Sequence, residues 1–255
     1  MVSGWNAMIP TTAQRYARAL YPLVLLALAW KELDAIVPML YGGEYWGTDL
    51  VVRGDLALFG RHPTVAMQRF FTPPLDELMA VFNLSYYLFL SLPLVLLVRG
   101  RTQAAAASMA IIALTYFTNF AFFLLLPVKS PPQILAEYPT LQPSEFTGYV
   151  VAPLMRSLQN SESVLGAAFP SSHVSGAFVC SLLARRVAPD LGRVLLPLSV
   201  GVALAAVYLG YHHALDPLAG FAWGGLSYVA GVRWLHARGE LPPNTPSLPG
   251  ETLPH

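Results

Sequence analysis

The chain has little charge. Only 11% of its 255 residues are Asp, Glu, Lys or Arg, whereas 55% are hydrophobic. Soluble globular domains carry about 25% charged residues, so this composition excludes that class and indicates an integral membrane protein. The formal net charge is only +1, and we therefore expect no nucleic-acid partner.

Cysteine and clustered metal ligands are also scarce. The single cysteine, Cys180, excludes an internal disulfide. The sequence offers no carboxylate cluster for a divalent cation, so we expect neither a metal nor another cofactor. It contains no internal repeat either. We expect one membrane-embedded catalytic domain, residues 1–238, followed by a proline-rich disordered tail, residues 239–255.

Apolar stretches of sufficient length recur along the chain. A helix needs about 20 residues to cross a bilayer. We expect an all-α polytopic protein with six transmembrane helices, at residues 18–40, 75–98, 104–126, 169–184, 194–211 and 215–232. The first is expected to be retained rather than cleaved as a signal peptide. Its Lys31, Glu32 and Asp34 either face the bundle as a polar cluster or lie at the membrane interface.

Two segments between these stretches do not resemble crossings. Residues 42–71 have a broken apolar pattern that predicts an amphipathic segment lying along the membrane surface. Residues 127–166 contain six prolines and scattered polar residues, which predict an ordered or lid-like loop.

The arginines predict the orientation. With six crossings, one side holds both termini and the basic residues Arg15, Arg18, Arg99, Arg101, Arg185, Arg186, Arg193, Arg233 and Arg238. By the positive-inside rule that side is cytoplasmic. The fourth and fifth crossings then return His173 and His212 to one level on the extracytoplasmic side, where we expect the active site.

Two motifs at that level can carry chemistry. In Phe169-Pro170-Ser171-Ser172-His173, the proline and serines predict a helix start. Its unpaired N–H groups and positive dipole end favour an anion, and a histidine beside bound phosphate can move protons. The second motif places Asp216 four residues after His212, so that the carboxylate can orient an imidazole acting as a nucleophile.

Neighbouring residues extend this site. Lys129 leaves the third crossing on the same side, where it either neutralises phosphate oxygens or reaches to lipid headgroups. His213 and Tyr211 are candidate substrate contacts. Taken singly, His173 is better explained by capping or packing, and His212 with Asp216 is consistent with a structural hydrogen-bonded pair. Their common depth in the membrane favours function.

These motifs resemble a known family. Pro170-Ser171-Ser172-His173 resembles the second signature, usually Pro-Ser-Gly-His, of the type 2 phosphatidic acid phosphatase superfamily. Tyr208 to His212 with Asp216 to Gly220 resembles its third. Asp55 to Gly60 resembles the subgroup that contains inositol phosphorylceramide synthases and, more distantly, sphingomyelin synthases.

The chain departs from the family at two points. Ala205 and Ala206 stand where the third motif commonly has Ser-Arg, and no arginine follows Lys129 until Arg156. Each departure removes a guanidinium that would clamp phosphate. A monoester dianion needs more positive charge than a diester monoanion, so the loss favours diester-handling transferases.

The resemblance implies a metal-independent lipid phosphatase or phosphotransferase that acts on a phosphorylated lipid in the bilayer. It implies that His212, held by Asp216, attacks phosphorus to form a phosphohistidine, and that His173 protonates the leaving group. Lys129, Ser171 and Ser172 would bind the phosphate. One alternative is transfer of the phospho-headgroup to an alcohol acceptor, as in the synthase subgroup, and another is a non-catalytic lipid-binding or transport protein.

Overall fold

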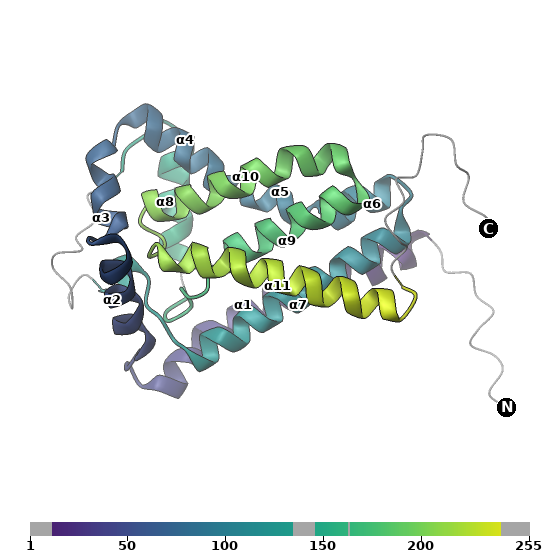
Figure 1. The fold of residues 1–255 in the computed structure, drawn as a ribbon, viewed down its shortest axis with the longest axis horizontal. Helices are drawn as coiled ribbons and strands as arrows, with labels where there is room; N and C mark the ends of the chain where they lie inside the picture. The colour runs from purple at the N-terminus through teal and green to yellow at the C-terminus, as the bar shows by residue number, and fades with distance from the viewer. Residues whose placement is uncertain (1–11, 135–145, 163, 241–255) are drawn as a thin grey trace.

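Helices form the regular structure of the chain in a computed structural model, which describes residues 12–134, 146–162 and 164–240 (Figure 1). This confirms the all-α prediction, and no strand occurs in those ranges beyond one isolated bridge between Val128 and Ala167. The disordered tail predicted from residue 239 onwards falls almost entirely outside the described residues.

Six helical passes lie along the long axis of the described part (Figure 1). Five are continuous: α1 (Thr12–Tyr41), α7 (Thr102–Leu125), α9 (Ser172–Val187), α10 (Pro189–Tyr208) and α11 (Leu215–Ala237). The sixth is broken into α4 (Pro73–Leu84), α5 (Tyr86–Leu90) and α6 (Leu92–Val98). The main core lies between these passes and includes Phe89, Ile112, Val179 and Leu183.

Not all six passes are long and apolar enough to cross a membrane. Of the described helices, α7 and α10 are, and the pass from Pro73 to Val98, bent by 49°, is a third candidate. Six transmembrane helices are therefore not confirmed. The 16 residues of α9 rise about 24 Å, less than the hydrocarbon thickness of about 30 Å. In α1, Lys31, Glu32 and Asp34 are exposed, which contradicts a bundle-facing polar cluster.

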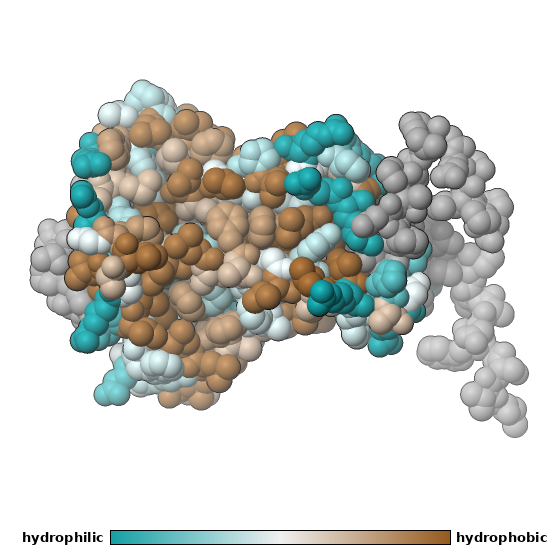
Figure 2. Space-filling view, viewed as in Figure 1, coloured by the Kyte–Doolittle hydropathy of each residue, from teal (hydrophilic) through white to brown (hydrophobic). Residues whose placement is uncertain are grey.

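The surface of the bundle has an apolar belt. Figure 2 shows hydrophobic residues along the middle of the visible face and hydrophilic residues gathered toward its two ends. Large apolar side chains are exposed on every pass except α9, among them Leu28, Leu88, Phe117, Val200 and Leu226. An exposed apolar surface of this extent is typical of a protein surrounded by lipid.

Short helices lie across the end of the bundle opposite the described termini (Figure 1). They are α2 (Gly47–Phe59), α3 (Pro63–Met67) and the 3-10 turn η1 (Gln68–Phe70). The helix α2 buries Val51, Val52 and Asp55 and exposes Leu50, Arg53 and Leu56. Residues 42–71 thus form short crosswise helices, and their placement along the membrane surface stays a prediction.

The prediction that residues 127–166 form a loop is wrong in one part. Besides the short turn η2 (Pro131–Ile134), the segment contains α8 (Val151–Glu162), which lies at the same end of the molecule as α2. Pro153 is compatible with this helix because it occupies the first turn, where its missing N–H has no helical partner. Glu77 accepts the amides of Tyr149, Val150, Val151 and Ala152 at 2.7–3.2 Å and so holds the start of α8.

A bridge closes the base of this segment. Val128 N–H donates to the Gly166 carbonyl at 2.9 Å, and Ala168 N–H donates to the Val128 carbonyl at 3.0 Å. The chain that leaves α7 and the chain that enters α9 are therefore paired directly before each reaches the site.

Glycines bring α9 and α11 together. A Cβ added at Gly220 would lie 2.8 Å from the Ser171 carbonyl oxygen, and one at Gly224 would lie 2.7 Å from the Ser175 carbonyl oxygen. The two helices therefore touch through their backbones, which places the first turn of α11 beside the first turn of α9.

Candidate active site

The centre of the site is the pair His212 and Asp216. The imidazole Nδ1 lies 3.0 Å from Asp216 Oδ2, which also accepts the His213 N–H at 2.9 Å. A carboxylate can only accept hydrogen bonds, so His212 Nδ1 must be the protonated nitrogen of this pair. In the neutral imidazole, Nε2 then keeps its lone pair. Burial lowers the pKa of His212 to about 4, so the ring is neutral at pH 7.

A helix end places His212 at this position. After α10, Gly210 adopts the left-handed conformation at φ 78, which glycine enters without a Cβ clash. The Tyr211 and His212 N–H groups then both donate to the Ala206 carbonyl, at 2.9 and 3.0 Å. This closure is the bonding pattern of a helix C-terminus, and it turns the chain so that His212 faces α9.

The start of α9 meets this pair. Ser171 caps the helix by accepting the Val174 N–H at 3.4 Å, and its Oγ lies 3.1 Å from His212 Nε2. The Ser171 N–H donates to the Asp216 carbonyl at 3.0 Å. In the described ranges no acceptor is bonded to the N–H groups of Ser172 and His173. These amides are the unpaired donors that make a helix start an anion site.

His173 faces His212. Their ring centroids are 6.1 Å apart with planes at 65°, so both rings can contact one phosphate group. On its other side the Tyr86 ring packs against His173, with centroids 4.4 Å apart. No described residue forms a hydrogen bond with the His173 imidazole, which leaves its nitrogens available to a substrate.

The two histidines line one cavity of about 120 Å³. Ser172, Ser130, Asn83 and Tyr211 add polar groups, and the remaining lining is apolar or aromatic: Trp30, Tyr87, Met155, Leu158, Val164, Ala167 and Ala168. A few convergent polar groups in an apolar wall are typical of small-ligand sites. Met155 and Leu158 come from α8.

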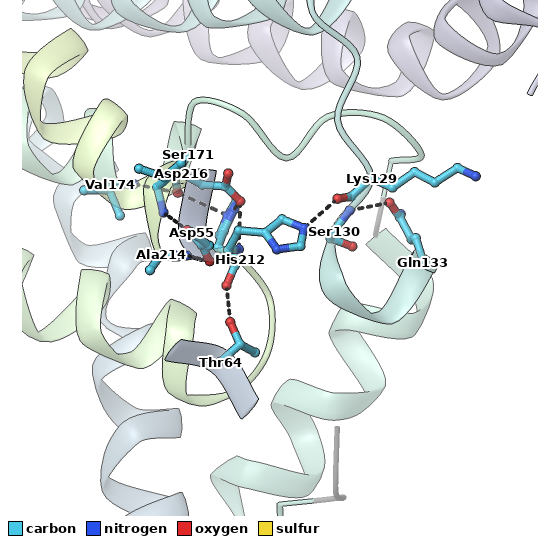
Figure 3. Close-up of polar contacts among 12 residues, drawn as sticks. Asp55, Thr64, Lys129, Ser130, Gln133, Ser171, Val174, His212, Ala214 and Asp216 are labelled. Atoms are coloured by element: carbon cyan, nitrogen blue, oxygen red, sulfur yellow. Dashed lines mark hydrogen bonds and ion pairs between the residues drawn. The ribbon is translucent and has the colours of Figure 1, made fainter. Parts of the chain in front are cut away.

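Lys129 and His213 contact each other rather than the cavity. His213 is buried, and its Nε2 lies 3.1 Å from the Lys129 carbonyl oxygen. The Lys129 ammonium lies over the Tyr45 ring, 5.0 Å from its centroid, and Figure 3 shows the side chain extending away from His212. Neither residue is among those that line the cavity. Their expected contacts with substrate remain predictions.

Positive charge is sparse around the cavity. No lysine or arginine is among its described lining residues. Arg156 belongs to α8 but donates to the Phe146 carbonyl and lies over the Phe146 ring, 5.0 Å from its centroid. Nor does any group of three His, Cys, Asp or Glu side chains in the described part of the chain have the arrangement of a metal site.

Three polar residues at the site were not predicted as site residues. Asp55 accepts the N–H groups of Ala214 and Leu215, Thr64 donates to the His212 carbonyl, and Thr48 accepts the Lys129 N–H. The sequence holds one signal for Asp55, because it shares the apolar face of α2 with Val51 and Val52, where a carboxylate needs a partner. The threonines have no comparable signal.

The chain is similar in sequence to known proteins. Residues 54–230, well over half of the chain, match the family described as the PAP2 superfamily. A PA-phosphatase related-family protein of Dictyostelium discoideum is 30% identical over 106 residues. That match covers 41% of this chain and 19% of the relative, so the chain spans only about a fifth of that protein. No solved structure matches. Membership of the synthase subgroup is not confirmed by these matches.

Proposed function

The chain belongs to the PAP2 superfamily, and from this premise we propose that it is a membrane enzyme that cleaves a phosphate ester of a lipid through a phosphohistidine. One observation carries the proposal. His173 and His212, 39 residues apart in sequence, face each other across one cavity at 6.1 Å, and His212 is held by a buried carboxylate.

The first chemical step is attack by His212. Its Nε2 lone pair forms a bond to phosphorus while the bond from phosphorus to the ester oxygen breaks. His173 gives a proton to that leaving oxygen. Asp216, 3.0 Å from Nδ1, stabilises the positive charge that the imidazole gains.

The second step returns the enzyme to its starting state. His173, now neutral, takes a proton from water, whose oxygen bonds to phosphorus as the bond to Nε2 breaks. Inorganic phosphate leaves, and His212 regains its lone pair. Oxygens that do not react are held by the Ser172 and His173 amides and by the hydroxyl of Ser171, which must turn away from Nε2 before attack.

Alanine substitutions test this proposal. In detergent micelles containing phosphatidic acid, wild-type protein should release inorganic phosphate. His173→Ala should lower kcat by about 10²–10⁴-fold, the usual contribution of a general acid, and His212→Ala should abolish turnover. His236→Ala, at an exposed histidine in the last turn of α11, should leave activity unchanged.

Trapping the intermediate adds an independent measurement. Denaturing the protein in alkali during turnover of lipid labelled with ³²P should leave label on the wild type and none on His212→Ala. Full turnover by folded His212→Ala would refute the mechanism. Lipid binding without turnover in wild-type protein would support the non-catalytic alternative instead.

A second candidate function is transfer of the phospho-headgroup to an alcohol. The absence of lysine and arginine from the described cavity lining favours it, because a diester monoanion needs less compensating charge than a monoester dianion. Incubation with a labelled phosphodiester lipid and a lipid alcohol separates the two reactions. A new labelled lipid supports transfer, and a labelled water-soluble phosphomonoester alone supports hydrolysis.

We also infer that all six passes cross the membrane, with the cavity on the extracytoplasmic side. The end opposite the cavity is rich in arginine, since Arg99 pairs with Asp190 at 3.0 Å and Arg185 and Arg186 lie in the last turn of α9. The positive-inside rule assigns that end to the cytoplasm.

Cysteine labelling in intact cells tests this orientation with little background, because Cys180 is buried. A membrane-impermeant maleimide should label Arg61→Cys, at an exposed position just after α2, and should label Thr102→Cys, at the exposed first residue of α7, only after lysis. The reverse pattern would refute the orientation.

A further inference from the structure

Three buried polar side chains from residues 47–64 hold three different parts of the site. Thr48, Asp55 and Thr64 are 5%, 1% and 4% exposed. Thr48 Oγ1 accepts the Lys129 N–H at 3.0 Å, and Thr64 Oγ1 donates to the His212 carbonyl at 3.1 Å. The crosswise helices α2 and α3 therefore contact both the segment after α7 and the loop that carries His212.

Asp55 makes the strongest of these contacts. Its Oδ2 accepts the Ala214 N–H and its Oδ1 accepts the Leu215 N–H, both at 2.9 Å (Figure 3). A buried carboxylate is costly unless it is hydrogen-bonded, and here each oxygen accepts one charge-assisted bond. Because the two amides open α11, the carboxylate also lies at the positive end of that helix dipole.

The helix α11 has no cap of its own. Its N-cap residue is Ala214, whose side chain cannot accept a hydrogen bond. Asp55, 159 residues earlier in the chain, supplies the cap from another helix. The fit is close, since a Cβ added at Gly54 would lie 2.4 Å from Leu215 Cδ1.

The capped amides lie between the two members of the catalytic pair. Ala214 and Leu215 are the residues that separate His212-His213 from Asp216. Fixing their N–H groups fixes the first turn of α11, and so the position from which Asp216 reaches His212 Nδ1 at 3.0 Å. Asp55 does not line the cavity, so it has no direct contact with substrate.

We propose that Asp55 is a positioning residue for the nucleophile: by capping α11 from α2 it sets the geometry between His212 and Asp216. This inference rests on the proposed function for its kinetic test. It goes beyond that function because it gives the crosswise helix α2 a role in positioning the catalytic pair.

The kinetic test compares three variants in micelles, with rates expressed per folded molecule. Asp55→Ala removes both acceptors and Asp55→Asn keeps one. Asp49→Asn is the matched control, because Asp49 lies on the same helix with its carboxylate 47% exposed and paired with Arg53. We expect kcat to fall about 10²-fold in Asp55→Ala, the cost of a misplacement of about 1 Å. Asp55→Asn should be intermediate, KM should change less than twofold, and Asp49→Asn should match the wild type.

Two outcomes would overturn the inference. If Asp55→Ala unfolds at a lower temperature but its folded fraction keeps the wild-type kcat, Asp55 only stabilises the fold. If KM rises while kcat is unchanged, Asp55 affects binding and not the nucleophile. Should Asp55→Ala fail to fold, Asp55→Asn decides between the same outcomes.

A spectroscopic measurement separates this inference from the proposed function. In protein labelled with ¹⁵N-histidine, the His212 Nδ1–H proton held by Asp216 gives a resonance that does not depend on turnover. It should be present in wild type and Asp49→Asn and be lost or shifted in Asp55→Asn. An unchanged resonance would overturn the inference. Wild-type protein that shows the resonance but turns over no lipid phosphate would contradict only the proposed function.

Discussion

Replacing Asp216 by asparagine isolates the charge of the carboxylate. Both hydrogen bonds to this side chain, from His212 Nδ1 at 3.0 Å and His213 N at 2.9 Å, end on Oδ2. Oδ1 is buried and has no hydrogen-bond partner in the described part of the chain. An asparagine with its oxygen at the Oδ2 position therefore keeps both bonds and the Nδ1–H tautomer, and loses only the negative charge.

The expected effect follows from the distance. For unit charges 3.0 Å apart and an effective dielectric constant of about 20, the attraction between carboxylate and imidazolium is about 5.5 kcal/mol. An amide oxygen carries a partial negative charge of about half a unit, so by Coulomb's law the amide retains about half of this attraction. The loss of about 2.7 kcal/mol applies where the imidazole has become positive, which corresponds to a kcat about 10²-fold lower.

The assay is single-turnover cleavage of a labelled lipid phosphate ester, with thermal unfolding measured in parallel. The buried amide nitrogen at the Oδ1 position should lower the free energy of unfolding by about 1–3 kcal/mol. A folded variant with kcat within threefold of the wild type would refute the electrostatic role of Asp216. A loss of 10⁴-fold or more would mean that the amide nitrogen faces Nδ1 and imposes the wrong tautomer, as in serine proteases.

Three further predictions concern the packing, the cavity wall and the pH dependence. Gly220→Ala should lower the free energy of unfolding by about 1–3 kcal/mol, because its Cβ would lie 2.8 Å from the Ser171 carbonyl. Gly225→Ala, whose nearest contact is 3.6 Å, is the matched control, and equal melting temperatures would contradict this account. Glu77→Gln should weaken the hydrogen bonds that hold the start of α8, and so raise KM more than it lowers kcat in a substrate titration. An unchanged KM would show that α8 has no role in substrate binding. Because burial lowers the pKa of His212 to about 4, His212 stays neutral down to about pH 5, and kcat/KM should show no loss from its protonation near pH 6.5.

Local signals in the sequence predicted much of this architecture. Pro170 and Ser171 predicted a helix start at this point, and α9 begins at Ser172, three residues after the predicted start at 169; the spacing of His212 and Asp216 predicted their contact. The helix α10 begins earlier than its apolar run because Pro189 and Asp190 form a favourable first turn. Each of these features depends on residues no more than four positions apart, so it can be recognised in a single sequence.

Other features depend on contacts between distant segments. The cap that Asp55 gives to α11 joins residues 159 apart, and no local pattern identifies Ala214 as its partner. The helix α8 was missed because its first turn is held by Glu77 from α4. The direction of the Lys129 side chain likewise depends on Tyr45, which lies 84 residues earlier in the chain.

Val128 forms two hydrogen bonds with the chain at Gly166 and Ala168. These bonds separate the helices that carry the site from the segment between Val128 and Gly166, whose length and sequence are less constrained. The chain enters and leaves this segment at tied points, so a change in the segment's length or content is not transmitted to Ser171. Under the proposed function, exchange of this segment between relatives is a route to a new lipid selectivity, because Met155 and Leu158 line the cavity while His173 and His212 lie outside the segment.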